Sequence, residues 1–333
     1  MAGNYNGVQA IIKTKYPSAI YIHCSSHILN LSLNAASKLP DIRNIFSIIS
    51  EICTFFRRSP KRSGVLSKMF TEGNKPSKRL PNFCETRWVE RHDSVQIFNE
   101  SLEEIIQSLE ELGEKGCSDA LSFHHRIVKF DFLLGVAVTS RLLELTLHLS
   151  QYLQTVNLDI VQAYDHIHLV VGKLKTIREN ADEEFHKIYL ETRIIAEKFG
   201  VEVSVPRRVG TQKYRSNVAC SDSESYYRIT LFAPYLDELI ANMTSRFLEN
   251  ESVVKTLSNI VPSRVVSCSY NDFQDMMNFY EKDLRNCKRE VLSELELWIT
   301  MWKRKTSRTS NPLEAIVDCD ENLQKGVFQH YVE

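Results

Sequence analysis

Residues 98–112 read Phe-Asn-Glu-Ser-Leu-Glu-Glu-Ile-Ile-Gln-Ser-Leu-Glu-Glu-Leu, and their pattern sets the predicted fold class. The apolar side chains follow one another at intervals of three and four residues, which places them on one face of an α-helix. They are Phe98, Leu102, Ile105, Leu109 and Leu112. The glutamates between them lie on the opposite face, so we interpret them as a solvated helix surface and not as catalytic carboxylates.

The same spacing returns in two further stretches. One consists of Ile160, Tyr164, Ile167, Val171 and Leu174. A longer one runs from Phe273 to Trp302 and predicts a single helix of about eight turns at 3.6 residues per turn. Helices therefore dominate the predicted fold, which is mainly α.

Breaks in this pattern predict how the chain is organised. Residues 19–24 (Ala-Ile-Tyr-Ile-His-Cys) are β-branched and aromatic and predict a strand, with helices following up to residue 56. Residues 57–79 hold eight cations against one glutamate, with prolines and glycines among them, and predict an exposed basic loop. Residues 80–303 predict a helical domain with a long polar loop near 201–222, and residues 304–333 predict a tail.

The charge balance excludes attraction to nucleic acid by the protein as a whole. Forty-one Lys and Arg face 42 Asp and Glu, a formal charge of −1, so such binding has to come from local patches. We predict one patch in the basic segment and a second in the long polar loop. Their candidate residues are Arg57, Arg58, Lys61, Arg62, Arg207 and Arg208.

Composition also indicates the cellular setting. Eight widely scattered cysteines are typical of free thiols in a reducing compartment, the nucleus or the cytoplasm. The most apolar stretch, residues 130–149, is interrupted by charged side chains such as Asp131 and Arg141, so we expect no membrane span. No phosphate-binding loop, dinucleotide fingerprint, nucleophile elbow or zincin motif occurs, and we expect no cofactor.

Cys24 and His27 stand three residues apart where the predicted strand meets its helix, and a thiolate and an imidazole can bind a metal there. Zinc sites need three or four protein ligands, and no second pair with matching spacing follows. We therefore favour a buried structural cysteine and a helix-capping histidine, with no metal site. A nucleophilic Cys–His pair has less support, because no orienting group accompanies it.

Arg87 and Trp88 follow the basic segment directly. An aromatic ring among cations suits stacking on a base while a phosphate is held. The alternative is a helix start capped by Thr86, with Trp88 in the core. The pattern alone favours this alternative.

Three stretches, in this order and at this separation, resemble hAT-superfamily DNA transposases and the genes domesticated from them. They are residues 6–10 with the Cys-x-x-His-x-Leu-Asn-Leu core of residues 24–31, then residues 86–88, and finally residues 206–210 with 226–228 and 294–298. The chain is similar in particular to the animal subgroup of zinc-finger MYM-type protein 1-like and 52 kDa repressor of the inhibitor of the protein kinase-like proteins. In that family, Cys24 and His27 match a motif near the active site, and Arg87 and Trp88 match a pair that handles the DNA end.

The resemblance implies a partial RNase H-like β/α remnant in residues 1–56, followed by the family's helical insertion domain. In the family, two aspartates and a glutamate hold Mg²⁺ for phosphodiester transfer. The second aspartate belongs to an Asp-Gly-Ala-Ser-Asn-Met-like motif expected before Met1, and the glutamate belongs to an Ala-Glu-Arg-x-Phe-Ser motif expected after residues 327–331. The resemblance therefore implies no catalytic residue in this sequence and no DNA cleavage.

Three functions stay open at this point. The first is a transposase-derived protein without catalytic carboxylates that retains nucleic-acid binding, with DNA as its partner. The second is a domesticated module that binds protein partners. The third is a truncated gene model whose full product is an active transposase. The sequence leaves the oligomeric state open.

Overall fold

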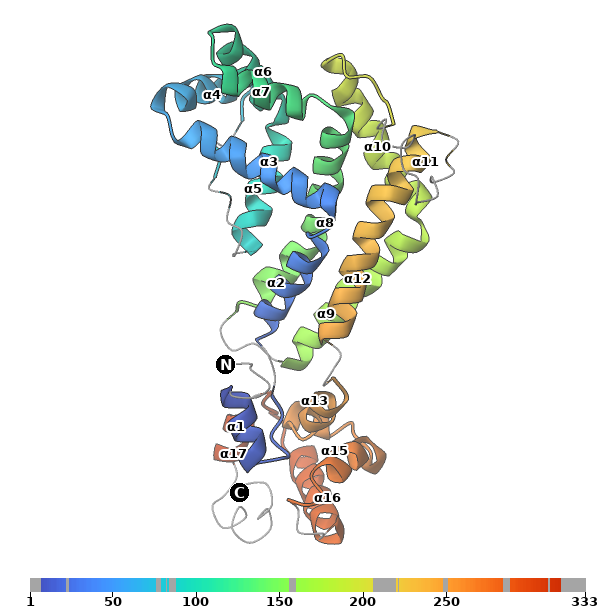
Figure 1. Ribbon diagram of the computed structural model, residues 1–333. Helices are drawn as coiled ribbons and strands as arrows, with labels where there is room; N and C mark the ends of the chain where they lie inside the picture. Colours follow the sequence, from blue (N-terminus) through green and yellow to red (C-terminus); the bar gives the residue numbers. More distant parts are fainter. Residues whose placement is uncertain are drawn as a thin grey trace. The chain divides into compact units, whose positions relative to one another are not determined.

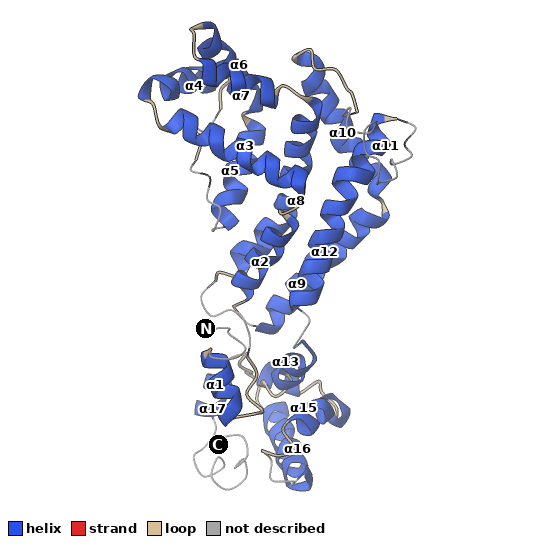
Figure 2. Ribbon diagram, viewed as in Figure 1, coloured by secondary structure: helices blue, strands red, loops and turns tan. Residues whose placement is uncertain are grey.

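The computed structural model describes residues 7–21, 24–75, 79–81, 83, 88–155, 160–205, 220, 222–247, 251–283, 288–310 and 312–318. Within these ranges the chain consists of helices joined by turns and short connections, and no strand is formed (Figure 2). The prediction of a mainly α fold is confirmed.

The helices have the following bounds. The α-helices are α1 Val8–Lys15, α2 Ser25–Ala36, α3 Pro40–Arg57, α4 Pro60–Glu72, α5 Trp88–Glu100, α6 Leu102–Glu114, α7 Ser118–Ile127, α8 Phe130–Tyr152, α9 Ile160–Glu179, α10 Ala181–Lys198, α11 Ser223–Tyr227, α12 Ala233–Phe247, α13 Glu251–Ser258, α14 Pro262–Val265, α15 Gln274–Phe279, α16 Lys288–Arg304 and α17 Pro312–Val317. A π-helical segment, η2, covers Arg228–Phe232, and a 3₁₀ segment, η3, covers Tyr270–Phe273.

The chain divides into two compact units. The larger unit comprises Cys24–Leu158 and Asp165–Arg246. The smaller unit comprises Met1–His23, Asp159–Tyr164 and Phe247–Glu333. Segments from both ends of the sequence therefore belong to the smaller unit.

α8 is the central helix of the larger unit, where it contacts α3, α5 and α10 (Figure 1). Leu134, Val138 and Leu142 are completely buried, and a helix that is apolar on nearly every side belongs in a core. By length and composition α8 could cross a membrane, but 67% of its most apolar window is buried inside the fold. α3 approaches α8 at Gly135, where an added Cβ would lie 2.1 Å from Ile45 Cδ1.

The apolar stripe of residues 98–112 is buried as predicted, with each of its five side chains at most 4% exposed. The helix itself is not continuous, because α5 ends at Glu100 and α6 begins at Leu102. The helical spacing survives the break: the backbone N–H of Ser101 bonds to Ile97 O, and the N–H of Ile105 bonds to Ser101 O, each at 3.0 Å. The stripe of α9 is likewise buried in its described side chains, from Tyr164 to Leu174.

Residues 57–79 contain a helix, which corrects the expectation of a basic loop. α4 starts at Pro60, and proline suits the first helical position because its φ is already helical and it has no N–H to leave unpaired. Ser59 precedes it as the N-cap, with its Oγ accepting from the Arg62 N–H at 3.5 Å. Leu66 and Phe70, one turn apart, are buried. Proline therefore marks a helix start here.

The strand expected at residues 19–24 is not formed in its described part. Residues 19–21 and Cys24 lie in no regular element, and residues 22 and 23 are outside the described ranges. A strand needs a neighbouring strand to pair its backbone groups, and the described chain offers none. The N–H of Ala19 bonds instead to Tyr16 O at 3.0 Å, which closes a turn after α1.

The long helix expected from Phe273 to Trp302 is interrupted in the smaller unit. α15 ends at Phe279, a turn follows, and α16 starts at Lys288, with residues 284–287 outside the described ranges. Five of the predicted apolar residues, Phe273, Met277, Leu295, Trp298 and Trp302, nevertheless share one core. It contains Val265, Phe273, Met276, Met277, Leu295, Trp298, Trp302 and Ala315. Helical spacing thus identified part of this core, without Val265, Met276 and Ala315, and it did not show where the chain turns.

Candidate nucleic-acid interface

Four cations gather where α3 ends and α4 begins. Arg57 is the last residue of α3, Arg58 follows it, and Lys61 and Arg62 lie in the first turn of α4. We call these four residues the basic corner. No acidic residue lies in the first turn of α4, although the positive end of the helix dipole is there and favours negative charge. The corner therefore favours an anion from outside the chain.

Arg62 is the member of the basic corner with the most internal contacts. Its guanidinium lies 4.0 Å from the centre of the Phe55 ring, and its Nη1 donates to the Phe55 carbonyl oxygen at 3.4 Å. Its Nη2 lies 3.9 Å from Asp119 Oδ2. Arg57, Arg58 and Lys61 are exposed and form no ion pair with a described residue. Three of the four cations are thus available to a ligand.

A hollow of about 410 Å³ between α3, α4 and α7 lies beside the corner, and Arg58 and Arg62 line it. Phe55 of α3 and Phe123 of α7 meet edge to face there, with ring centres 5.2 Å apart. The guanidinium of Arg126, also from α7, lies 5.5 Å from the centre of the Phe123 ring. Each of the two rings is therefore in contact with one guanidinium, Phe55 with that of Arg62 and Phe123 with that of Arg126.

Arg126 is held in place by Glu51 of α3. Its Nη1 donates to Oε2 at 2.5 Å and its Nη2 donates to Oε1 at 3.3 Å, a two-pronged pair that fixes the plane of the guanidinium. The hydrogen bond from Arg126 holds the pKa of Glu51 below its ordinary value, although burial opposes the shift. Because Arg126 is paired in this way, Arg58 is the arginine of the hollow that is left for an incoming anion.

Arg57 lines a different hollow, of about 370 Å³, together with Ser63 and Arg79. Neighbouring residues of an α-helix lie about 100° apart around its axis, so Arg57 and Arg58 serve different sides of the corner. Cations on two sides of the start of α4 suit contact with more than one backbone phosphate.

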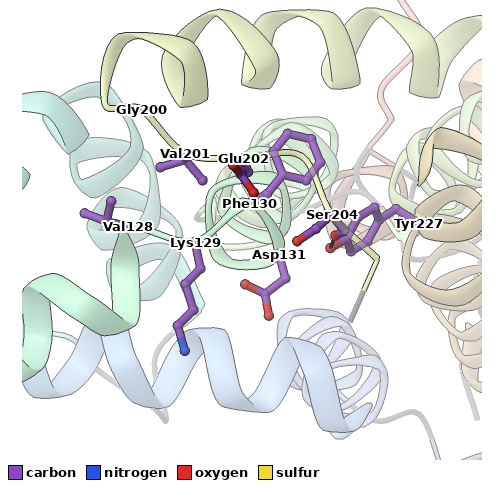
Figure 3. Close-up of a pocket in the computed structure, with 9 residues that line it drawn as sticks. All are labelled: Val128, Lys129, Phe130, Asp131, Gly200, Val201, Glu202, Ser204 and Tyr227. Carbon is purple, nitrogen blue, oxygen red and sulfur yellow. Dashed lines mark hydrogen bonds between the residues drawn. The ribbon is translucent and has the colours of Figure 1, made fainter. Parts of the chain in front are cut away.

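A separate polar pocket of about 320 Å³ lies at the start of α8 (Figure 3). The Tyr227 hydroxyl donates to the Ser204 carbonyl oxygen at 2.9 Å, and burial raises the pKa of Tyr227, so the donor proton is retained. Asp131 Oδ1 accepts from the backbone N–H of Phe132 at 2.9 Å. With these groups engaged inside the protein, we interpret the pocket as a structural contact that fixes the start of α8.

The side chains of the other predicted nucleic-acid-binding residues lie outside the described part of the structure. Arg87, Arg207 and Arg208 lie outside the described residues. Trp88 is the first residue of α5, but its side chain is not among those described. Both interpretations of Trp88 therefore stay open.

Cys24 and His27 are both exposed, which corrects the expectation of a buried cysteine. Cys24 is the N-cap residue of α2, and its side chain makes no capping hydrogen bond. Among the described residues, no three His, Cys, Asp or Glu side chains are grouped so that they could hold a metal ion.

Sequence reasoning missed Glu51, Phe123 and Arg126 as neighbours of the corner. Phe123 and Arg126 reach it only because α7 packs against α3, and no local motif links Arg126 to Arg62, which precedes it by 64 positions. Phe123 is an apolar residue of an amphipathic helix, so its pattern is that of an ordinary core residue. Only the tertiary packing shows the hollow.

The structure thus defines a helical protein that carries a local cationic corner on a chain of nearly neutral charge. The curated proteins similar to it include the human (Homo sapiens) and mouse (Mus musculus) proteins named 52 kDa repressor of the inhibitor of the protein kinase. The human protein is 26% identical over 305 residues and the mouse protein 25% over 306 residues. Both matches cover 87% of this chain, which spans 40% of the length of each relative.

These matches confirm the predicted resemblance in its coarse form, a distant relationship over most of the chain. No family model matches the sequence, and no solved structure matches the chain.

Proposed function

We propose that this chain is a transposase-derived helical protein that binds nucleic acid through the basic corner without cutting it. One observation carries the proposal: Arg57, Arg58 and Lys61 are exposed together at the positive end of α4 and make no ion pair with a described residue. Cations of this kind contact phosphates, and phosphate contacts supply the sequence-independent part of nucleic-acid affinity. The nucleus is the compartment that this function suits.

Duplex DNA is the partner that the corner favours over single strands. Proteins that bind single strands offer open aromatic faces on which bases stack. At this corner Phe55 is buried, and the guanidiniums of Arg62 and Arg126 lie over Phe55 and Phe123. The exposed cations remain for contact, and these recognise the phosphate backbone.

The absence of cutting rests on the family resemblance. The motifs that would supply two of the family's metal-binding carboxylates, Asp-Gly-Ala-Ser-Asn and Ala-Glu-Arg-x-Phe-Ser, do not occur in the 333 residues. The same resemblance supports the RNase H-like origin of residues 1–56, the insertion-domain origin of the helices that follow, and the assignment to the animal subgroup.

Fluorescence anisotropy with a labelled DNA duplex tests the binding. Arg57→Glu/Arg58→Glu should abolish binding at low salt, because two attractive charges become repulsive. Lys173→Glu/Lys175→Glu is the matched control, since both lysines are exposed on α9 and the net charge changes equally. Equal reductions of affinity in the two variants would show that the corner is not the interface.

Cutting is tested separately with supercoiled plasmid and Mg²⁺. We expect no nicked product above the buffer control. Nicking that persists in highly purified protein would refute this half of the proposal.

A second function, binding of a protein partner, is favoured by α1. Val8, Ile11 and Ile12 lie on one face of this helix and are 53%, 65% and 47% exposed, and α1 buries no residue. An exposed apolar stripe of this kind is typical of an interaction surface. A partner that is captured by the wild type but not by Ile11→Asp, while DNA affinity is unchanged, would establish it.

A further inference from the structure

Ser59 stands in the middle of the basic corner, in the sequence Arg-Arg-Ser-Pro-Lys-Arg of residues 57–62. Of the nine prolines in the chain, only Pro60 follows a serine or a threonine. Proline differs from every other residue in its fixed φ and its missing N–H, so the substrate-binding site of a kinase can distinguish a serine that is followed by proline. A serine before proline, with a cation two positions after the proline, is the pattern that proline-directed serine kinases accept.

We propose that Ser59 is phosphorylated by a proline-directed serine kinase and that its phosphate closes the basic corner to nucleic acid. The second half of this statement rests on the proposed function. The first half concerns Ser59 alone and can be tested without nucleic acid.

The position of Ser59 allows a kinase to reach it. Its side chain is half-buried, and its backbone is extended, with φ −139° and ψ 119°. The first turn of α4 is closed by one backbone hydrogen bond, from the Ser63 N–H to Ser59 O at 2.9 Å, while the Arg62 N–H reaches Ser59 Oγ only at 3.5 Å. Gly64 lowers the helix propensity further. For a kinase to extend Ser59 and Pro60, this first turn has to open locally, which breaks that backbone hydrogen bond and the weak Ser59 cap.

The transfer itself requires ATP, which the kinase supplies together with Mg²⁺. Ser59 Oγ forms a new bond to the γ-phosphorus, the bond from that phosphorus to the bridging oxygen breaks, and ADP leaves. The hydroxyl proton passes to the catalytic aspartate of the kinase.

The phosphate would add a charge of about −1.5 to −2 at pH 7 among the four cations of the corner. Its oxygens would accept charge-assisted hydrogen bonds, and Arg58, which has no ion pair with a described residue, is the first candidate donor. Roughly two positive charges would be neutralised. If duplex DNA is then held by two fewer phosphates, the slope of log affinity against log salt falls by about 1.8.

The first experiment incubates the full chain with a cyclin-dependent kinase and Mg²⁺-ATP and locates the phosphate by mass spectrometry. We expect one phosphate, on Ser59, and none on Ser59→Ala or Pro60→Ala. Alanine is the best helix former, so Pro60→Ala keeps α4 while it removes the recognition element. Ser63→Ala, a half-buried serine of the same helix with no proline after it, should be modified like the wild type. An unmodified Ser59, or modification that survives Pro60→Ala, would overturn the proposal.

The second experiment measures DNA affinity of the modified and unmodified chains. We expect at least a tenfold loss at low salt after modification, and no change when Ser59→Ala is treated in the same way. Equal affinity of the two forms would overturn the regulatory half. If the unmodified chain does not bind DNA, the proposed function has failed, whereas the mass spectrum still decides whether Ser59 is the site.

Discussion

Removing the amine of Lys75 should destabilise the larger unit more than removing any exposed ion pair of α4. Lys75 Nζ lies 3.5 Å from Glu104 Oε1, and the side chains are 28% and 9% exposed. Glu104 is therefore buried and does not belong to the solvated helix surface expected for the glutamates of residues 98–112. Glu104 lies on α6 beneath the end of α4, where Gly73 leaves it room, since a Cβ there would stand 2.4 Å from Oε1. Lys75→Met would leave this buried carboxylate without its cation.

The magnitude follows from the distance and the burial. At 3.5 Å and an effective dielectric constant of about 20, the two charges attract by about 5 kcal/mol. Solvent reaches Lys75 and screens part of this attraction, so we expect Lys75→Met to lower the free energy of unfolding by about 2–3 kcal/mol. Lys68→Met is the control, because Lys68 and Glu72 are 61% and 59% exposed at 3.8 Å, and it should cost under about 0.5 kcal/mol.

Urea unfolding followed by far-ultraviolet circular dichroism measures these differences. Adding Glu104→Gln to Lys75→Met should recover part of the missing stability, because it removes the unpaired buried charge. If Lys75→Met costs no more than Lys68→Met, or if the double variant is no more stable than Lys75→Met alone, the buried pair does not hold α4 on α6.

Two further predictions concern close packing and acid stability. Gly135→Ala should cost about 1–3 kcal/mol, because its Cβ would stand 2.1 Å from Ile45 Cδ1, and Ile45→Val should restore part of the loss by removing that carbon. Gly64→Ala, whose Cβ would meet nothing within 4 Å, should instead raise the free energy of unfolding by about 0.5–1 kcal/mol, which a higher melting temperature would show. The hydrogen bond from Arg126 lowers the pKa of Glu51 in the folded protein. The ionised Glu51 therefore adds to the free energy of unfolding above its ordinary pKa of 4.5, and this stabilisation is lost as pH falls through the lower folded pKa. Below about pH 4.5 the wild type should therefore lose stability faster than Glu51→Gln, and parallel melting curves would contradict this.

Periodicity predicted the core of this protein better than it predicted the ends of its helices. The stripe from Phe98 to Leu112 is buried, yet Ser101 separates two helices inside it, with φ −110° and ψ 18°. The stripe that ends at Trp302 is interrupted by a turn. The spacing of apolar residues by threes and fours predicts which side chains are buried. A short turn that preserves this spacing cannot be recognised from the sequence pattern.

The candidate site was partly predictable for a related reason. The cations of residues 57–62 are evident in the sequence, but Pro60 also has the pattern of a loop residue, and its role as a helix start depends on the burial of Leu66 and Phe70. The link between Arg62 and Arg126 arises from the packing of α7 on α3, which single-sequence reasoning does not supply.

The salt dependence of duplex binding tests the proposed interface most directly. Log affinity should fall linearly with log salt, and replacing Arg57, Arg58, Lys61 and Arg62 together by alanine should flatten the slope by about 0.9 for each phosphate that the corner no longer binds, or roughly 2.7 for its three available cations. Lys173→Ala/Lys175→Ala should leave the slope unchanged. A wild-type slope that the quadruple replacement does not alter would show that the basic corner does not contact nucleic acid.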